Sequence, residues 1–293
     1  MDLRTLLRIS RPRFWLYLGG TFLLGAACAA PSLAALSSAT VALMLVYFLL
    51  PANLFLYGIN DLADADTDAH NAKKGTKEHK LLQRERRALS GWVWLTAFIS
   101  AGVAFAFAWQ GAWLPSLLVL LFLALAAGYS AAPVRFKARP LLDSASNVLY
   151  VVPGLVGYAM FARALPAFEL IVAFACWTAA MHLFSAIPDI AADKRAKLST
   201  TATMLGQKRS LLACSTLWLV FAVIVVTRTS AGWLFAPAFV YVAVPLALVG
   251  SSVARIDKVY WWFPIFTGVI GFLVFWYVII ARFSLDALFA LIS

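Results

Sequence analysis

Charged residues are scarce in this sequence, and no long polar stretch interrupts its hydrophobic segments. Asp, Glu, Lys and Arg make up 13% of the 293 residues, whereas 63% are hydrophobic. A water-soluble fold cannot bury so large an apolar fraction, which excludes a soluble enzyme or a soluble binding module. The composition therefore predicts an all-α, polytopic membrane protein without a separate soluble domain.

Cysteine is also scarce, and the first apolar run lacks the pattern of a cleavable leader. The three cysteines are scattered through apolar segments without the spacing of a metal site or a disulfide framework, so they are predicted to be small core residues. No small-residue cleavage site follows the first apolar run, and no cleavable signal is expected. The cysteines are Cys28, Cys176 and Cys214.

Nine hydrophobic segments are interpreted as membrane-spanning helices, although the first is short. If the N-terminus lies in the cytoplasm, the inner loops carry 21 of the 24 Lys and Arg residues. The positive-inside rule predicts such a bias, and adding or removing a span would destroy it. We therefore predict nine spans in the plasma (inner) membrane, with the N-terminus in the cytoplasm and the C-terminus outside. The predicted spans are 14–30, 39–59, 91–109, 113–130, 143–161, 167–187, 211–229, 233–253 and 259–281.

The net charge of +11 needs no nucleic-acid partner, because it lies on the predicted cytoplasmic loops. Residues 2–12 contribute to it. They are expected to form a short amphipathic helix with Arg4, Arg8 and Arg11 on its polar side.

The two halves of the chain have a similar layout. An acidic cluster follows the second predicted span and another follows the sixth, and each precedes a basic loop and two further spans. This layout favours a single domain over 1–293, built from two four-helix halves at about 1–142 and 143–257, with a ninth helix at 258–282.

Six of the 13 acidic residues lie in these two clusters, beside apolar helices that cannot stabilise bare carboxylates. A divalent cation would offset their repulsion, and Mg2+ prefers a few carboxylates together with phosphate oxygens. If the second span continues as a helix, the first cluster apart from Asp66 shares one stripe with Asn53 and Asn60. The alternative is a solvated acidic loop, although two clusters at matching helix ends argue against it. The predicted metal ligands and catalytic residues are Asp61, Asp64, Asp68, Asp189 and Asp193.

Basic residues follow both clusters and suit an anion such as diphosphate, whose charge exceeds that of one Mg2+. Positive-inside topology alone also supplies basic loops, so both interpretations stay open for any single lysine. Arg135 and Lys137 are the stronger candidates, because they lie close to the membrane edge in the tight run 129–137.

Two polar residues within the predicted spans are further candidates. His182 lies seven residues before Asp189, which places it on the same helix face but deeper in the bilayer. An ionisable side chain at that depth is a functional candidate, and a histidine hydrogen-bonded between helices is the alternative. The same two interpretations stay open for Asn147.

At this point the motifs become recognisable. Asn-Asp-x-x-Asp-x-x-x-Asp at 60–68, with Asp-x-x-x-Asp at 189–193, resembles the UbiA superfamily of intramembrane prenyltransferases over nearly the whole chain. The segments 10–17, 51–61 and 181–189 look more narrowly like the lycopene elongase branch, which lengthens a linear carotenoid toward C50 products. The resemblance implies that both acidic motifs hold Mg2+ and diphosphate, with Asn60 taking part in the first. It also implies that Lys73, Arg135 and Lys137 contact the diphosphate and that Asn53 orients the first motif.

The loop after the second motif departs from the family pattern. Relatives often carry Gly and then a basic residue before Thr-Thr-Ala, whereas Lys197 and Ser199 precede that run here. Ala191 and Ala192 stand where acidic residues are often found. These departures concern the contact of the loop with diphosphate rather than the metal-binding pairs.

The expected function is Mg2+-dependent transfer of a prenyl group, dimethylallyl by preference, to lycopene or a related linear carotenoid. The diphosphate would leave, and the acceptor would attack the resulting carbocation in a dry, lipid-accessible cavity among the nine helices, capped by cytoplasmic loops. The expected partners are the prenyl diphosphate, the hydrophobic acceptor and membrane lipid, and a partner subunit or a homo-oligomer is compatible with the sequence. The alternatives are prenyl transfer to a quinone, chlorophyll or haem acceptor, and a cation-coupled transporter.

Overall fold

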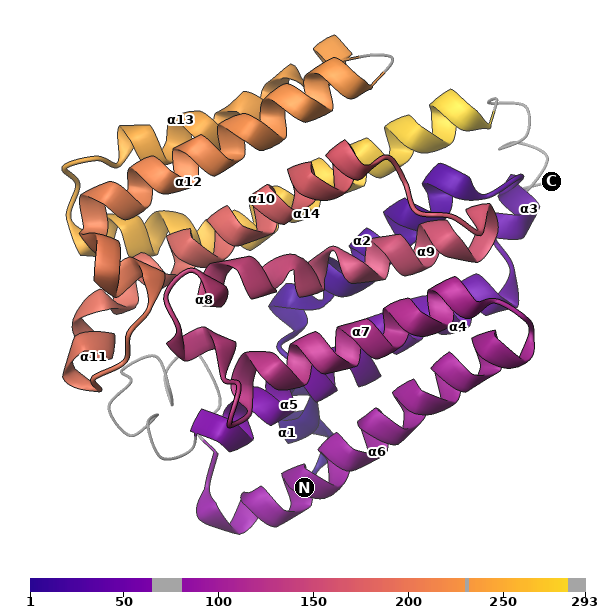
Figure 1. Ribbon diagram of the computed structural model, residues 1–293, viewed down its shortest axis with the longest axis horizontal. Helices are drawn as coiled ribbons and strands as arrows, with labels where there is room; N and C mark the ends of the chain where they lie inside the picture. Colours follow the sequence, from indigo (N-terminus) through magenta and orange to yellow (C-terminus); the bar gives the residue numbers. More distant parts are fainter. Residues whose placement is uncertain (65–80, 230–231, 284–293) are drawn as a thin grey trace. The chain divides into compact units, whose positions relative to one another are not determined.

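The computed structural model describes residues 1–64, 81–229 and 232–283, and every regular element within these ranges is a helix (Figure 1). The predicted all-α class is therefore confirmed. Within the described ranges, seven helical segments are long and apolar enough to cross a membrane, as expected of an integral membrane protein. They are Ala39–Asp64, Gln83–Trp109, Trp113–Ser130, Leu142–Ala162, Phe168–Arg195, Thr201–Arg228 and Val253–Arg282.

Two of the nine predicted spans form shorter helices. The first, predicted at 14–30, forms α2 (Trp15–Ala29). The eighth, predicted at 233–253, forms η6 (Gly232–Ala238) and α13 (Phe239–Ala247), each of which contains a proline. Proline lacks the amide hydrogen that a continuous helix needs, which shortens this segment. The number of nine spans stays a prediction.

The chain folds into two compact units. Unit 1 consists of Met1–Ala131, Val152–Leu165 and Pro264–Ser293, and unit 2 consists of Ala132–Val151 and Pro166–Phe263. The halves predicted at about 1–142 and 143–257 describe an internal duplication and not these compact units, and that duplication stays a prediction. Unit 1 contains α1 (Leu3–Ile9), η1 (Pro12–Phe14), α2, α3 (Leu33–Leu36), α4 (Ala39–Leu49), α5 (Pro51–Asp64), α6 (Gln83–Trp109), α7 (Trp113–Ser130) and α9 (Val152–Ala162). Unit 2 contains η3 (Phe136–Ala138), α8 (Leu142–Ala145), η4 (Ser146–Tyr150), α10 (Phe168–Ala186), η5 (Ile187–Asp189), α11 (Ile190–Arg195), α12 (Thr201–Arg228), η6 and α13, while α14 (Val253–Arg282) contributes to both.

In unit 1, α2 and α9 pack side by side with their backbones in close approach (Figure 1). A Cβ atom on Gly25 would lie 2.0 Å from the carbonyl oxygen of Gly154, and one on Gly157 would lie 2.2 Å from that of Phe22. Helices in lipid associate by van der Waals packing, which small residues at the interface improve. Gly25 and Gly157 therefore set the distance between these two helices.

In unit 2, α10 packs against α12, and α12 packs against α13 (Figure 1). The fully buried ring of Trp218 stacks on Phe263 with ring centroids 5.5 Å apart, and it meets Tyr241 at 5.6 Å and Phe184 at 5.9 Å. Aromatic pairs at these separations contribute stability beyond the area that they bury. This cluster holds α10, whose C-terminal end leads into the second acidic motif.

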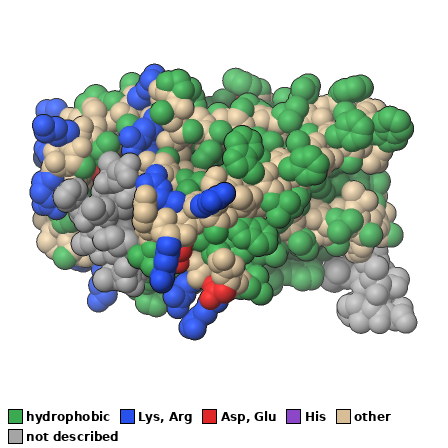
Figure 2. Space-filling view, turned by 90° about the horizontal axis from the view of Figure 1, so that it is seen from below, with side chains coloured by type: hydrophobic (Ala, Val, Ile, Leu, Met, Phe, Trp, Pro, Cys, Tyr) green, Lys and Arg blue, Asp and Glu red, His purple; other side chains and the backbone are tan. Residues whose placement is uncertain are grey.

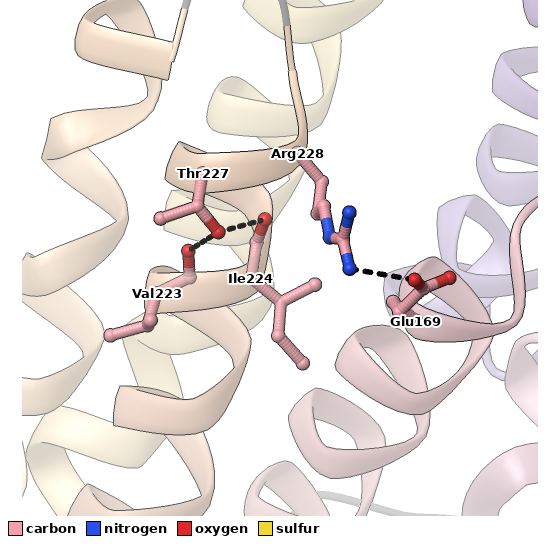
Figure 3. Close-up of polar contacts among 5 residues, drawn as sticks. All are labelled: Glu169, Val223, Ile224, Thr227 and Arg228. Atoms are coloured by element: carbon pink, nitrogen blue, oxygen red, sulfur yellow. Dashed lines mark hydrogen bonds and ion pairs between the residues drawn. The ribbon is translucent and has the colours of Figure 1, made fainter.

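An ion pair joins the first turn of α10 to the last turn of α12, as Figure 3 shows. Arg228 Nη2 lies 2.8 Å from Glu169 Oε1, while Thr227 donates to the carbonyl oxygens of Val223 and Ile224. Both charged side chains are about half exposed, and such pairs contribute about 0–1 kcal/mol. Three of the 24 Lys and Arg residues lie outside the predicted inner loops, and Arg228 is one of them. Glu169 neutralises its charge.

Large hydrophobic side chains cover wide areas of the surface (Figure 2). Phe98, Trp109 and Phe168 are exposed by 77%, 81% and 74%. Apolar areas of this kind are unfavourable in water, whereas lipid chains solvate them. The surface therefore agrees with the membrane location that the composition predicts.

Candidate active site

The first acidic motif begins on α5 of unit 1. The second predicted span continues as a helix through Asp64, so the expected extension of that helix into the motif is confirmed. Asn60, Asp61 and Asp64 lie in the last two turns of α5 that the structure describes. Asp68 and Lys73 lie outside the described residues.

The span bends at Pro51, where α4 ends and α5 begins. Proline lacks an amide hydrogen and its ring clashes with the preceding turn, so the helix is interrupted and carbonyl groups at the end of α4 lack helical donors. The fully buried Asn53 replaces them, because its Nδ2 donates to the carbonyls of Phe48 at 2.7 Å and Leu49 at 3.2 Å. Asn53 thereby caps the end of α4 where α5 begins, and the orienting role that the resemblance implies stays a prediction.

Side chains from two other parts of unit 1 contact the motif. Arg11 Nη2 lies 3.1 Å from Asp61 Oδ1, and its guanidinium group lies over the Tyr57 ring at 4.7 Å. Asp61 is nearly fully buried, and a buried carboxylate needs a partner of this kind. The hydroxyl of Ser130, at the end of α7, donates to Asn60 Oδ1 at 2.9 Å. Asn60 and Asp61 are therefore held in place by side chains from outside α5.

The pairing of Arg11 with Asp61 was not predicted. The sequence places Arg11 on the polar side of a helix over 2–12, whereas α1 ends at Ile9 and Arg11 adopts a left-handed backbone with φ of 50°. The prediction is wrong at this end because Pro12 disfavours a helical conformation at the residue before it. The signal in the sequence that could have indicated the role of Arg11 is an arginine directly before a proline at the start of the first predicted span.

The second acidic motif lies in unit 2, at the end of α10. The prediction that His182 and Asp189 share one helix face assumes a continuous α-helix, but Pro188 ends the α-helical ladder, and a 3-10 turn (η5) carries Asp189. Helix α11 then begins at Ile190, and Asp193 lies in its first turn. The two carboxylates therefore flank the start of α11 instead of sharing one continuous α-helical face.

The loop after α11 explains one departure from the family pattern. Lys197 has a φ of 55°, its amide donates to the carbonyl of Lys194, and the amide of Leu198 donates to that of Asp193. This is a Schellman motif, in which the left-handed residue is usually glycine. Lys197 adopts this conformation at a cost, whereas the glycine that the family pattern implies for this loop would adopt it without a Cβ clash.

Replacing Lys197 with glycine is expected to stabilise the protein by about 1 kcal/mol, because glycine adopts a positive φ without a Cβ clash. Lys197→Ala is the matched control, since it removes the same charge but keeps Cβ. Unfolding of the purified protein in one detergent measures both variants. Equal stability of the glycine and alanine variants would contradict this interpretation.

Asp143 is a second residue that the sequence analysis missed. Its side chain is fully buried, its Oδ2 accepts the amide of Thr201 at 2.7 Å, and its Oδ1 accepts the Thr201 hydroxyl. Asn147 donates to the backbone carbonyl of Asp143 at 2.6 Å, and α8, which carries Asp143, packs against α10, which carries His182. An acidic residue in the apolar run 140–152 was the available signal.

Two further predicted residues of unit 2, Arg135 and Lys137, lie shortly before Asp143 in the sequence. Arg135 has a left-handed backbone with φ of 39° and begins the 3-10 turn η3, which contains Lys137. Turn η3 packs against α8, the short helix that carries Asp143. In unit 2, the short helix α8 therefore lies between the basic segment 135–139 and Asn147 in the chain, and it packs against α10, which carries His182.

The oxygen donors of the two motifs fit Mg2+, which prefers carboxylates and amide oxygens. Asp61 and Asp64 lie three residues apart on α5, next to Asn60. Among the described residues, no three acidic, histidine or cysteine side chains form a complete metal site. The predicted set of five ligands, and a cavity shared by both motifs, stay predictions.

An apolar helical fold with acidic motifs at helix ends is typical of intramembrane prenyltransferases. Residues 18–263 match the UbiA prenyltransferase family, and the chain belongs to this family. It is therefore a prenyltransferase, and the alternative of a cation-coupled transporter is set aside.

The resemblance to lycopene elongases is also confirmed. The chain is 43% identical to a lycopene elongase/hydratase of Haloferax volcanii over 268 residues, which cover 91% of this chain and 85% of the relative. It is 38% identical to a lycopene elongase/hydratase of Halobacterium salinarum, over 92% of this chain and 94% of the relative.

Solved structures support the fold. A UbiA homolog from Archaeoglobus fulgidus, bound to DMAPP and Mg2+, superimposes with a TM-score of 0.67 at 21% identity, over 92% of this chain and 99% of the homolog. The same homolog bound to GPP and Mg2+ gives a TM-score of 0.65 at 20% identity, over the same fractions of the two chains.

Proposed function

We propose that this prenyltransferase moves a dimethylallyl group from its diphosphate to lycopene or a related linear carotenoid, at the inner face of the plasma membrane. The observation that carries the proposal is the placement of Asn60, Asp61 and Asp64 on the last turns of a membrane-spanning segment. Such a segment places a binding site for the charged diphosphate of a prenyl donor next to the apolar environment that its hydrocarbon chain needs. The lycopene elongase/hydratase relatives support the choice of acceptor.

The acidic residues are proposed to hold Mg2+, and basic residues to hold the oxygens of the diphosphate that remain exposed. When bound, Mg2+ would lower the energy of the negative charge that develops on the leaving diphosphate. Arg135 and Lys137 donate to the same group, as does Lys73 in the loop after the first motif. The proposed metal ligands are Asp61, Asp64, Asp68, Asp189 and Asp193.

The reaction breaks the allylic C–O bond, and its electron pair leaves with the diphosphate. A terminal double bond of the acceptor attacks the allylic cation, and the new cation on the acceptor loses a proton or takes up water and then loses a proton. The apolar spans exclude bulk water, which would otherwise capture the first cation. His182 is proposed as the group that accepts the final proton.

Inverted membrane vesicles provide the test, since they expose the inner face of the membrane. With Mg2+, dimethylallyl diphosphate and lycopene, mass analysis should find a product heavier by one or two C5 units, with or without added water. Right-side-out vesicles should be inactive, because the charged donor does not cross the bilayer.

Vesicles from the same host without this chain are the control. Prenylation of aromatic acids in place of lycopene would reject the carotenoid acceptor. Equal activity of both vesicle orientations would reject the predicted topology.

A further inference from the structure

The carboxylate of Asp143 accepts three hydrogen bonds inside unit 2. Its Oδ1 accepts from the amide of Ser144 at 2.8 Å and from the hydroxyl of Thr201, and its Oδ2 accepts from the amide of Thr201 at 2.7 Å. All three partners donate, so the position needs a group that only accepts. A carboxylate is such a group, whereas an amide would turn a donor toward a donor.

Thr201 connects this carboxylate to the end of the basic segment. The amide of Leu141 donates to the Thr201 hydroxyl oxygen at 2.6 Å. Leu141 itself has a φ of 70° and a ψ of −44°, a backbone conformation that is strained for leucine. Such a conformation persists only where surrounding contacts enforce it, and the Thr201 hydroxyl is one of those contacts.

Thr200, which precedes Thr201 in the chain, contacts the second acidic motif. The hydroxyl of Thr200 makes a long hydrogen bond of 3.5 Å to Asp193 Oδ2 and also caps α12 by accepting the amide of Thr203. Asp143 therefore lies where the basic segment 135–139, the strained residue Leu141 and the loop after Asp193 are joined by consecutive contacts.

We propose that Asp143, through Thr201, is a positioning residue that fixes the spacing between the basic segment 135–139 and Asp193 for diphosphate binding. The proposal rests on the proposed function, in which both groups contact the same diphosphate. A ligand held by a metal on one side and by cations on the other needs that spacing set in advance. Asp143 itself touches neither ligand.

The experiment measures binding of inorganic diphosphate with Mg2+ to the purified full-length chain in nanodiscs, by isothermal titration calorimetry. Thr201→Val keeps the volume but removes the hydroxyl, and Asp143→Asn keeps the shape but removes the charge. Each should raise Kd about 10-fold or more, as is typical when a supporting partner of a ligand is lost. In turnover, the KM for dimethylallyl diphosphate should rise while kcat changes little.

Two variants serve as controls. Thr201→Ser keeps the hydroxyl and should bind within about twofold of the unchanged chain, since the hydrogen bonds can still form. Ser210→Ala removes a fully buried hydroxyl on the same helix, for which no partner exists among the described residues, and it should leave binding unchanged.

The outcomes separate this inference from the proposed function. If the unchanged chain bound no Mg2+–diphosphate, the proposed function itself would fail. If the unchanged chain bound Mg2+–diphosphate, and the correctly folded variants Asp143→Asn and Thr201→Val bound it equally well, only the positioning role would fail. Loss of folded protein in both variants would also overturn that role, because the pair would then be needed for the fold.

Discussion

Asp64→Asn is expected to reduce prenyl transfer by about 100-fold or more while the protein remains folded. Asparagine keeps the size of the side chain but removes the charge that a Mg2+ ligand supplies, and losing one group that stabilises developing charge typically costs that much. Asp64 is half-buried on α5, and asparagine keeps the shape of its side chain, so the fold should tolerate the replacement. The initial rate of product formation in inverted vesicles measures the effect.

Asp2→Asn is the matched control for Asp64→Asn. The exposed side chain of Asp2 caps α1 by accepting the amide of Thr5 at 2.8 Å, and asparagine caps helices equally well. This variant should therefore keep full activity. Near-normal turnover of Asp64→Asn would count heavily against its assignment as a metal ligand.

Gly157→Ala is expected to destabilise the protein by about 3 kcal/mol or more. The added Cβ would lie 2.2 Å from the carbonyl oxygen of Phe22 and 2.8 Å from the amide nitrogen of Ala26, which are backbone atoms of α2 that no side-chain rotation can move. Helices α2 and α9 would have to separate, and overpacking of this kind is costly even in adaptable cores. Unfolding in a single detergent measures the loss.

Gly102→Ala is the control for Gly157→Ala, because Gly102 lies on an exposed face of α6 with no atom near its Cβ position. Alanine favours a helix over glycine, so this variant should be equal to the unchanged chain or slightly more stable. If both variants were equally stable, the close contact between α2 and α9 would not determine the stability of unit 1.

Local sequence patterns predicted the helix that continues through Asp64, since both the apolar run and the motif continue at helical spacing. The same reasoning failed at Pro188, where a proline inside an apolar run replaced an α-helical turn by a 3-10 turn. It also failed at Arg11, where Pro12 ended the amphipathic pattern. At both Pro188 and Arg11, the proline was a local signal of a helix end, and the longer hydrophobic or amphipathic pattern around it obscured that signal.

Composition and short-range order were enough to predict an all-helical membrane protein with acidic motifs at helix ends, because hydropathy, charge bias and motif spacing are properties of neighbouring residues. The pairing of Arg11 with Asp61, 50 residues away, and of Asp143 with Thr201, 58 residues away, came only from the folded chain. Buried carboxylates need partners, but many arginines and threonines could supply them. Which one does so depends on how distant helices pack, and no local pattern encodes that choice.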